Sequence, residues 1–233
     1  MLQGKISVIT GAAGNLGRAV AAAFSAAGSF LVLLDRDVSS LRSAYAEAGE
    51  RTVLAAADLM QEGSVAGAVR SALEQFSRID VLCNLAGGFD MGPPVHETPE
   101  PMWQHMLDLN AKSVINMARA VVPGMIASRY GKIINVAAGA GLAGKANMGA
   151  YSAAKSAVIR LTESMSAELR DHGINVNCVL PSILDTPQNR AAMPKADPRR
   201  WVAPAALAEV VLFLASDKSA AIHGAAIPVT GLV

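Results

Sequence analysis

Seven short apolar runs alternate with longer segments of helical periodicity, and this alternation most constrains the fold. The runs are rich in Val, Ile, Leu and Ala and lie at 5–10, 30–35, 52–58, 79–84, 131–137, 174–180 and 225–230. The helical segments lie at 16–27, 37–48, 61–76, 99–128, 151–171 and 204–215. Strands that are apolar on both faces are typical of a parallel sheet covered by helices on both sides. The pattern therefore predicts an α/β fold, a single doubly wound Rossmann-type domain over 1–233 with a seven-stranded parallel sheet flanked by helices.

The segment from about 181 to 203 departs from this regular pattern. It contains four prolines, at 181, 187, 194 and 198, among Asp, Arg and Ala residues. It follows the sixth predicted strand, at the carboxyl edge of the sheet, where ligands bind in doubly wound folds. We expect a loop with a short helix that covers the substrate.

Composition and charge argue against several classes of partner. The formal net charge is +1, and like charges form no long run, so nucleic acid and an anionic membrane surface are not expected as partners. No apolar stretch approaches the length of about 18 residues that spans a membrane, and the first residues lack a signal-peptide pattern. The spacing typical of metal ligands is absent from the two cysteines, Cys83 and Cys178, and from the histidines, which include His105. We expect a cytoplasmic protein with buried thiols, no metal and a small-molecule substrate.

Three glycines follow the first predicted strand and open the first predicted helix, in the stretch ITGAAGNLGRAV. Gly11 would form the tight turn, Gly14 would let the backbone approach a pyrophosphate, and Gly17 would let helix and strand pack closely. Asp35 ends the second predicted strand, where a carboxylate can bind the adenosine ribose and repel a 2′-phosphate. Arg36 could instead pair with that phosphate, but no basic residue stands inside the glycine turn. The pattern therefore favours NAD over NADP.

Two further aspartates lie near this site. Asp37 can cap the next helix, which leaves Asp35 for the cofactor. Asp58 ends the third predicted strand, where its carboxylate suits either the adenine amino group or a cap on the strand end.

Five motifs in the right order make the chain resemble the short-chain dehydrogenase/reductase family over nearly its full length. They are TGAAGNLG, NLAG, LDLNAKS, YSAAK and NCVLPSILDT. The resemblance implies three catalytic residues, Tyr151, Lys155 and Asn110. It implies a cofactor site formed by Gly11, Gly14, Asn15, Leu16, Gly17, Asp35, Asp58, Leu59, Asn84, Ala86, Gly87, Val136, Tyr151, Lys155, Pro181, Ile183 and Thr186. It also implies a homodimer or homotetramer, assembled through the segments 99–128 and 151–171.

Several positions depart from the motifs of that family. Asn15 stands where a glycine is usual, and asparagine is the non-glycine residue that best tolerates a left-handed backbone. Leu85 replaces an asparagine, and Ser182 replaces a glycine. Ala138 replaces the serine whose hydroxyl usually contacts the substrate carbonyl, 13 residues before Tyr151.

Tyr151 and Lys155 lie four residues apart, so they project from one face of the predicted helix. A free phenol has a pKa of about 10, and we expect the neighbouring ammonium to lower it toward a useful range. Lys155 can also hydrogen-bond the nicotinamide ribose, and Asn110 falls where the family holds a water in a proton relay. The resemblance implies hydride transfer between nicotinamide and a small carbonyl or quinonoid substrate, with Tyr151 as general acid/base.

The missing serine leaves open how the substrate oxygen is polarised. Loss of one such donor costs about 3–4 kcal/mol in the transition state. Either the substrate is already electrophilic, as a quinonoid ring is, or a polar group elsewhere supplies the contact. Asn147 and Ser182 are the candidates for that group.

A narrower resemblance suggests an alternative activity. CNLAGG and DTPQNRAAMPKAD are similar to segments of dihydropteridine reductases, which belong to the same family, use NADH and also lack the serine. A third hypothesis is a non-catalytic dinucleotide-binding sensor or scaffold. Retention of Asn110, Tyr151 and Lys155 together favours an enzyme.

Overall fold

The computed structural model describes residues 1–47 and 49–233, which contain one seven-stranded parallel sheet. Its strand order is β3-β2-β1-β4-β5-β6-β7. The strands are β1 (Ile6–Thr10), β2 (Phe30–Asp35), β3 (Thr52–Ala56), β4 (Val81–Asn84), β5 (Gly131–Val136), β6 (Ile174–Pro181) and β7 (Ala226–Val229). The predicted fold is confirmed, and each strand begins and ends within two residues of its predicted bounds.

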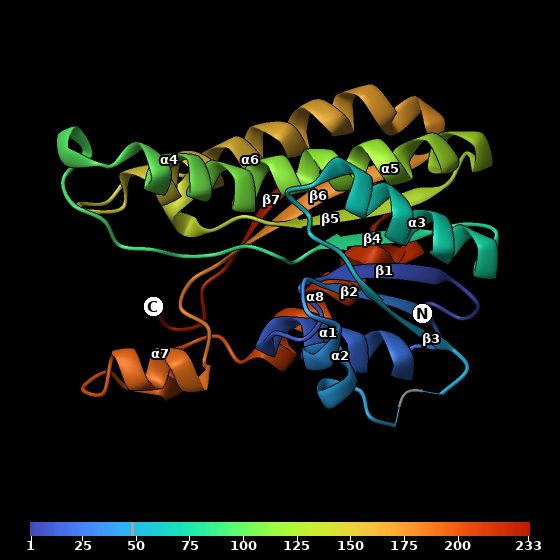
Figure 1. Cartoon of the computed structure of the whole chain (residues 1–233), viewed down its shortest axis with the longest axis horizontal. Helices are drawn as coiled ribbons and strands as arrows, with labels where there is room; N and C mark the ends of the chain where they lie inside the picture. Colours follow the sequence, from blue (N-terminus) through green and yellow to red (C-terminus); the bar gives the residue numbers. More distant parts are fainter. Residues whose placement is uncertain (48) are drawn as a thin grey trace.

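Helices cover both faces of the sheet (Figure 1). The α-helices of the described residues are α1 (Asn15–Ala26), α2 (Val38–Ala44), α3 (Glu62–Phe76), α4 (Glu100–Leu107), α5 (Ser113–Ser128), α6 (Gly149–Leu169), α7 (Pro187–Ala192) and α8 (Pro204–Ala215). Figure 1 shows α1, α2 and α8 on one face and α3, α4, α5 and α6 on the other. This is the two-sided cover that continuous apolar strands require.

Adjacent residues of one strand supply the two cores. Ile9 of β1 packs in the core that contains Phe24 of α1, whereas Val8 packs in the core that contains Met117 of α5. All of these side chains are fully buried. Burial of each of these side chains contributes about 1.5–3 kcal/mol to the stability of the fold. The two cores therefore hold in place the edge of the sheet that carries the site.

The helix predicted over 99–128 is divided by a π-helical turn. α4 ends at Leu107, the turn spans Asp108–Lys112, and α5 begins at Ser113. Such a turn widens the helix by one residue and frequently marks a functional site. Here it buries Asn110, which is 1% exposed.

The helix predicted over 37–48 is shorter than expected. α2 ends at Ala44, and Tyr45 donates its hydroxyl to the carbonyl of Ala12 at 2.7 Å. This bond fastens the end of α2 to the glycine turn, and the residue at 48 lies outside the described part of the chain.

The late segment contains the predicted short helix, α7. Leu184 and Val202 form an isolated bridge that joins the two ends of this segment. Asn15 Nδ2 donates to Gln188 Oε1 at 2.9 Å, which links α7 to the first residue of α1. The segment therefore lies beside the glycine turn, although the two are far apart in sequence.

Candidate active site

The glycine turn between β1 and α1 has no room for side chains at two positions. A Cβ on Gly17 would lie 2.3 Å from the carbonyl oxygen of Gly11. Gly11 itself has a φ of +64°, in the left-handed region that favours glycine. The turn therefore brings α1 against β1 as the motif predicts.

The first turn of α1 fits the pyrophosphate of a dinucleotide. Gly14 is the N-cap and offers no side chain to the free amides of that turn, which are suited to an anion. Asn15 is the first helical residue and does not have a positive φ, so the expectation of a left-handed asparagine is wrong. Its amide instead holds α7 through Gln188.

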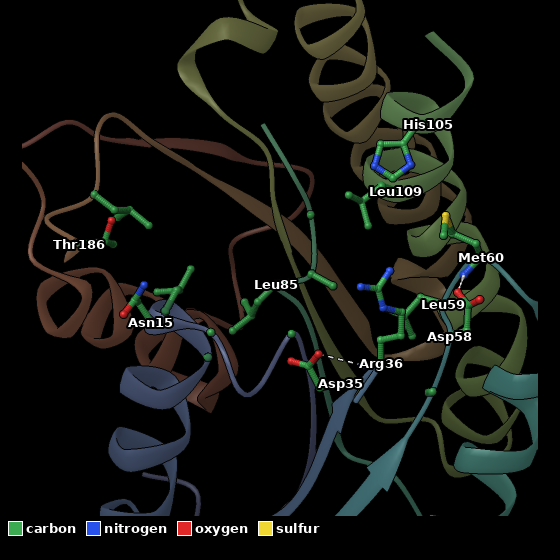
Figure 2. A pocket seen from close by; sticks show the side chains of 18 residues that line it. Asn15, Asp35, Arg36, Asp58, Leu59, Met60, Leu85, His105, Leu109 and Thr186 are labelled. Atoms are coloured by element: carbon green, nitrogen blue, oxygen red, sulfur yellow. Dashed lines mark hydrogen bonds between the residues drawn. The ribbon is translucent and has the colours of Figure 1, made fainter. Parts of the chain in front are cut away.

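Asp35 at the end of β2 is held by two backbone amides. Its Oδ2 accepts from Ala13 N at 3.0 Å and its Oδ1 accepts from Arg36 N at 2.8 Å. Figure 2 shows the carboxylate of Asp35 and the guanidinium of Arg36 together at the cavity. Asp37 caps α2 by accepting from the amides of two serines, so the predicted helix cap at Asp37 is confirmed.

A cavity of about 590 Å³ lies at the carboxyl edge, where the strand order reverses between β1 and β4. Eleven predicted cofactor residues line it: Gly11, Gly14, Asn15, Leu16, Gly17, Asp35, Asp58, Leu59, Ala86, Gly87 and Thr186. Asp58 Oδ1 accepts from Met60 N at 3.0 Å, which orients its carboxylate at the cavity wall. Both the glycine cradle and the acidic wall fit a dinucleotide.

The sequence pattern did not identify every residue of the lining. The cavity is also lined by Arg36, Ala57, Met60, Leu85, His105, Leu109 and Leu184. His105 has no metal-ligand spacing in the sequence and no place in the predicted cofactor site, but Figure 2 places it and Leu109 over the cavity. Their i, i+4 spacing indicates only a shared helix face, and the contact depends on how α4 packs.

Two of the predicted catalytic residues converge beside this cavity. Asn110 donates through Nδ2 to Met106 O at 3.0 Å and accepts through Oδ1 from Gly88 N at 3.2 Å. A Cβ on Gly87 would lie 2.8 Å from Asn110 Oδ1 and 3.2 Å from Lys155 Nζ. Because Gly87 lines the cavity, the amide of Asn110 and the ammonium of Lys155 both lie next to the cavity, against the same glycine.

Burial dominates the electrostatics of Tyr151 and Lys155. Lys155 is 5% exposed and donates to Val136 O at 2.9 Å, and burial lowers its pKa to about 8. Its Nζ lies 5.9 Å from the centroid of the Tyr151 ring. Burial raises the pKa of Tyr151 to about 12, a shift opposite to the lowering expected from the ammonium.

Ala138 is buried two residues after the end of β5, and the two candidates for replacing its missing hydroxyl were Ser182 and Asn147. Ser182 donates its hydroxyl to Thr230 O at 2.7 Å, so that proton is already used. Asn147 is exposed in a left-handed conformation, with a φ of +60°.

Asn84 joins two strands beneath the site. It is buried, and its Nδ2 donates to Asn135 Oδ1 at 2.8 Å, which ties β4 to β5. Asn135 in turn donates to Thr162 Oγ1 of α6 at 2.9 Å. Asn84 therefore supports the sheet beneath the site and does not line the cavity.

The segment after β6 positions three other predicted residues. Thr186 caps α7 by accepting from Asn189 N at 3.2 Å, and it lines the cavity. Pro181 is buried at the end of β6, and Ile183 accepts from Val202 N at 2.9 Å. Pro181 and Ile183, like Val136, are not part of the cavity wall.

Metal chemistry and a membrane span find no support in the described residues. Residues 1–47 and 49–233 contain no group of three or more His, Cys, Asp or Glu placed to hold a metal ion. None of the helices in this part of the chain is long and apolar enough to cross a membrane.

Comparisons with known proteins identify the family of this chain. The family model for short chain dehydrogenase matches residues 5–197. Sorbitol dehydrogenase of Cereibacter sphaeroides is 38% identical over 185 residues, which is 79% of this chain and 72% of that protein. The 3-oxoacyl-[acyl-carrier-protein] reductase of Thermotoga maritima is 33% identical over 244 residues, which is 99% of this chain and 98% of the other.

Solved structures are similar over nearly the whole chain. NAD+-bound xylitol dehydrogenase has a TM-score of 0.91 and 30% identity and covers 99% of each chain. A 3-ketoacyl-(acyl-carrier-protein) reductase from Brucella melitensis complexed with NADH has a TM-score of 0.89 and 28% identity, covering 99% of this chain and 98% of the other. The chain therefore belongs to the short-chain dehydrogenase family and is an NAD(P)-dependent oxidoreductase.

Proposed function

We propose that this protein transfers hydride between NADH and a small carbonyl or quinonoid compound, with Tyr151 as the general acid/base. The observation that carries this proposal is the approach of Lys155 and Asn110 to one backbone position, Gly87, which also lines the dinucleotide cavity. A bound reduced nicotinamide would supply the hydride.

Three side chains have distinct roles in this proposal. Tyr151 gives its proton to the substrate oxygen during reduction and takes it back during oxidation. Burial raises the pKa of Tyr151 to about 12, and the ammonium form of Lys155 acts in the opposite direction because it favours the phenolate. Asn110 accepts from Gly88 N and so positions the backbone that borders the reacting carbon.

NAD is the favoured cofactor because Asp35 is anchored at the cavity. Two amides hold its carboxylate, so an added 2′-phosphate would meet a fixed negative charge. Arg36 also lines the cavity and offsets part of that repulsion. Asp35→Ser is expected to raise NADPH affinity at least tenfold relative to NADH, which fluorescence titration measures; an unchanged ratio would contradict the assignment.

Ala138 narrows the substrate that this site can reduce. Without the usual hydroxyl, the carbonyl oxygen receives a proton from Tyr151 but no second side-chain donor from position 138. A quinonoid or conjugated carbonyl needs less polarisation than a simple ketone, which makes it the favoured class.

The direct test is NADH binding together with turnover. Purified protein is expected to bind NADH and to oxidise it with at least one member of a panel of quinones, conjugated ketones, simple ketones and quinonoid dihydropterin. Binding without turnover across the whole panel would support the sensor hypothesis, which Ala138 favours. Turnover confined to the dihydropterin would support the dihydropteridine-reductase alternative.

We also propose that the protein assembles as a homodimer or homotetramer in the cytoplasm. The family resemblance carries this proposal, and α5, on which Ile115 is 39% exposed, is one of the helices that would contact a second copy. Cys83 and Cys178 are both buried and free, in keeping with a reducing compartment. Sedimentation would distinguish the assemblies, and a monomer at micromolar concentration would contradict self-association.

A further inference from the structure

Strongly exposed apolar side chains gather on the two loops that flank Tyr151. Phe89, Met91 and Val95 lie between β4 and α4, and Leu142 lies between β5 and α6; their exposed fractions are 57%, 58%, 73% and 61%. Apart from the chain termini, the other exposed large apolar side chains in the described residues are all below 40% exposed. Exposed apolar surface of this kind often marks a ligand-binding groove. We call these four residues the apolar rim.

The apolar rim is attached to the reacting groups. The ring of Phe89 meets the ring of Tyr151 edge-on, with centroids 5.0 Å apart and an interplanar angle of 88°. Val95 lies against the start of α6, because a Cβ on Gly149 would lie 2.7 Å from its Cγ2.

Backbone contacts hold the two loops together. Gly92 N donates to Asn147 O at 2.9 Å, which links the loop after β4 to the loop after β5. The turn before Leu142 packs on α6, since a Cβ on Gly141 would lie 2.8 Å from the backbone of Lys155. Both halves of the rim therefore border the segment that carries Tyr151 and Lys155.

The two loops that carry the apolar rim, 85–99 and 137–148, contain three carboxylate or ammonium groups, on Asp90, Glu97 and Lys145. Position 138 offers only a methyl group, and Ser182 gives its proton to Thr230. The charged side chains of the two loops are exposed, and Asp90 and Lys145 are of opposite sign. They do not form the basic cluster that would recognise a phosphorylated substrate.

We propose that the apolar rim selects an uncharged carbonyl compound that carries an aromatic ring, an aryl ketone or a quinone, with its ring against Phe89 and its oxygen directed at Tyr151. This inference rests on the proposed function. In the reaction, the carbonyl carbon gains the hydride supplied by the reduced nicotinamide, and the carbonyl oxygen gains the proton of Tyr151. The phenolate then regains a proton from water. A polyol or sugar ketone would instead place hydroxyl groups against apolar side chains, where they lack partners.

Ligand affinity tests this proposal without depending on turnover. We would titrate 2-acetonaphthone and D-fructose by calorimetry into the protein saturated with NAD+, which cannot reduce either ketone. The aryl ketone is expected to bind at least tenfold more tightly. Phe89→Ala is expected to weaken its binding about three- to tenfold, the size of one aromatic contact.

Matched variants separate a ring contact from a general loss of structure. Phe213→Ala removes another exposed phenylalanine, on α8, and is expected to leave the affinity unchanged. Phe89→Leu keeps the apolar bulk without the ring and is expected to lose part of the affinity, so the proposal stays testable if Phe89→Ala does not fold. Equal or tighter binding of D-fructose, or an aryl ketone affinity that neither Phe89 variant changes, would overturn it.

Other outcomes distinguish this inference from the proposed function. Tight aryl ketone binding without turnover of any compound would support the ligand class and contradict the enzyme. Turnover of sugar ketones in preference to aryl ketones would support the enzyme and overturn the rim. Dissociation of an oligomer by Phe89→Ala, with ketone affinity unchanged, would assign the rim to a subunit contact and overturn the proposal as well.

Discussion

A buried lysine lies near each end of β5, and the two lysines differ in the groups that surround their charge. Lys132 belongs to the strand itself, whereas Lys155 belongs to α6. At the amino end, Lys132 donates to Asn175 Oδ1 at 2.7 Å, and the attraction of Asp217 opposes the lowering of its pKa by burial. At the carboxyl end, Lys155 donates to the backbone carbonyl of Val136 at 2.9 Å. Burial lowers the pKa of Lys155 to about 8, and among the described residues no carboxylate contributes to that pKa.

The difference between the two lysines indicates which of them lowers the stability of the fold. A buried charge is usually paired, because desolvation disfavours the charged form. Lys132 has a side-chain acceptor and a nearby carboxylate, as a structural lysine should. Lys155 has neither, and it adjoins the cavity through Gly87. An unpaired titratable group in a cleft is a mark of a functional site.

The largest expected contrast is in activity. Lys155→Met is expected to lower kcat/KM by about 100- to 1,000-fold, because it removes the charge that assists proton transfer from Tyr151. Lys132→Met is expected to stay within about threefold of the parent, because it lies at the opposite edge of the sheet. Steady-state kinetics on the best substrate measures both. Equal losses in the two variants would remove the distinction between the lysines.

The next contrast is in stability, with the opposite sign. The pKa of Lys155 falls from 10.5 to about 8 on folding, so the free energy of unfolding is reduced by about 3 kcal/mol at pH 7. Between pH 8 and 10.5 the unfolded chain holds a proton that the folded chain lacks, and stability therefore rises with pH in that window. Lys155→Met is expected to be more stable than the parent at pH 7 and to lose this rise.

Lys132→Met is the control for that measurement. It leaves Asn175 Oδ1 without its donor, which costs about 1–3 kcal/mol for a buried acceptor, so it is not expected to gain stability. Urea unfolding at pH 7 and pH 9.5 compares the variants. A Lys155→Met protein less stable than the parent at pH 7 would contradict the account of an uncompensated charge.

A smaller effect is expected at Ala138, which follows the carboxyl end of β5. Ala138→Ser restores the hydroxyl that the family usually has at this position, and it is expected to raise kcat/KM for simple ketones by about tenfold or more, given the usual contribution of an oxyanion donor. Conjugated or quinonoid substrates are expected to gain less, since they need less polarisation. Progress curves with both substrate classes measure the ratio. The same gain for both classes would show that substrate activation does not compensate for Ala138.

Sequence periodicity predicted the sheet and the glycine turn because both follow from local pattern. The apolar runs are buried on both faces. No other residue fits at Gly17, because its Cβ would collide with the carbonyl oxygen of Gly11. The π-helical turn at Asp108–Lys112 was not predicted, since a shift of backbone hydrogen bonds leaves no composition signal.

Features that depend on packing were also missed. His105 reaches the cavity because of how α4 packs, and Asn15 holds α7 instead of adopting a left-handed turn. The pKa of Tyr151 rises because its ring is buried, which overrides the effect expected from Lys155. Each of these depends on residues that are distant in sequence.

The central claim is that Tyr151 remains the proton donor although the usual serine is Ala138. Single-turnover oxidation of NADH by the parent and by Tyr151→Phe, at saturating NADH and with the best substrate of the panel, tests it most directly. Loss of a general acid lowers the rate about 100- to 10,000-fold. The phenyl ring of the variant is expected to keep the contact with Phe89, and the affinity of the variant for NADH is expected to be unchanged. A Tyr151→Phe protein that transfers hydride at the parent rate would contradict the claim.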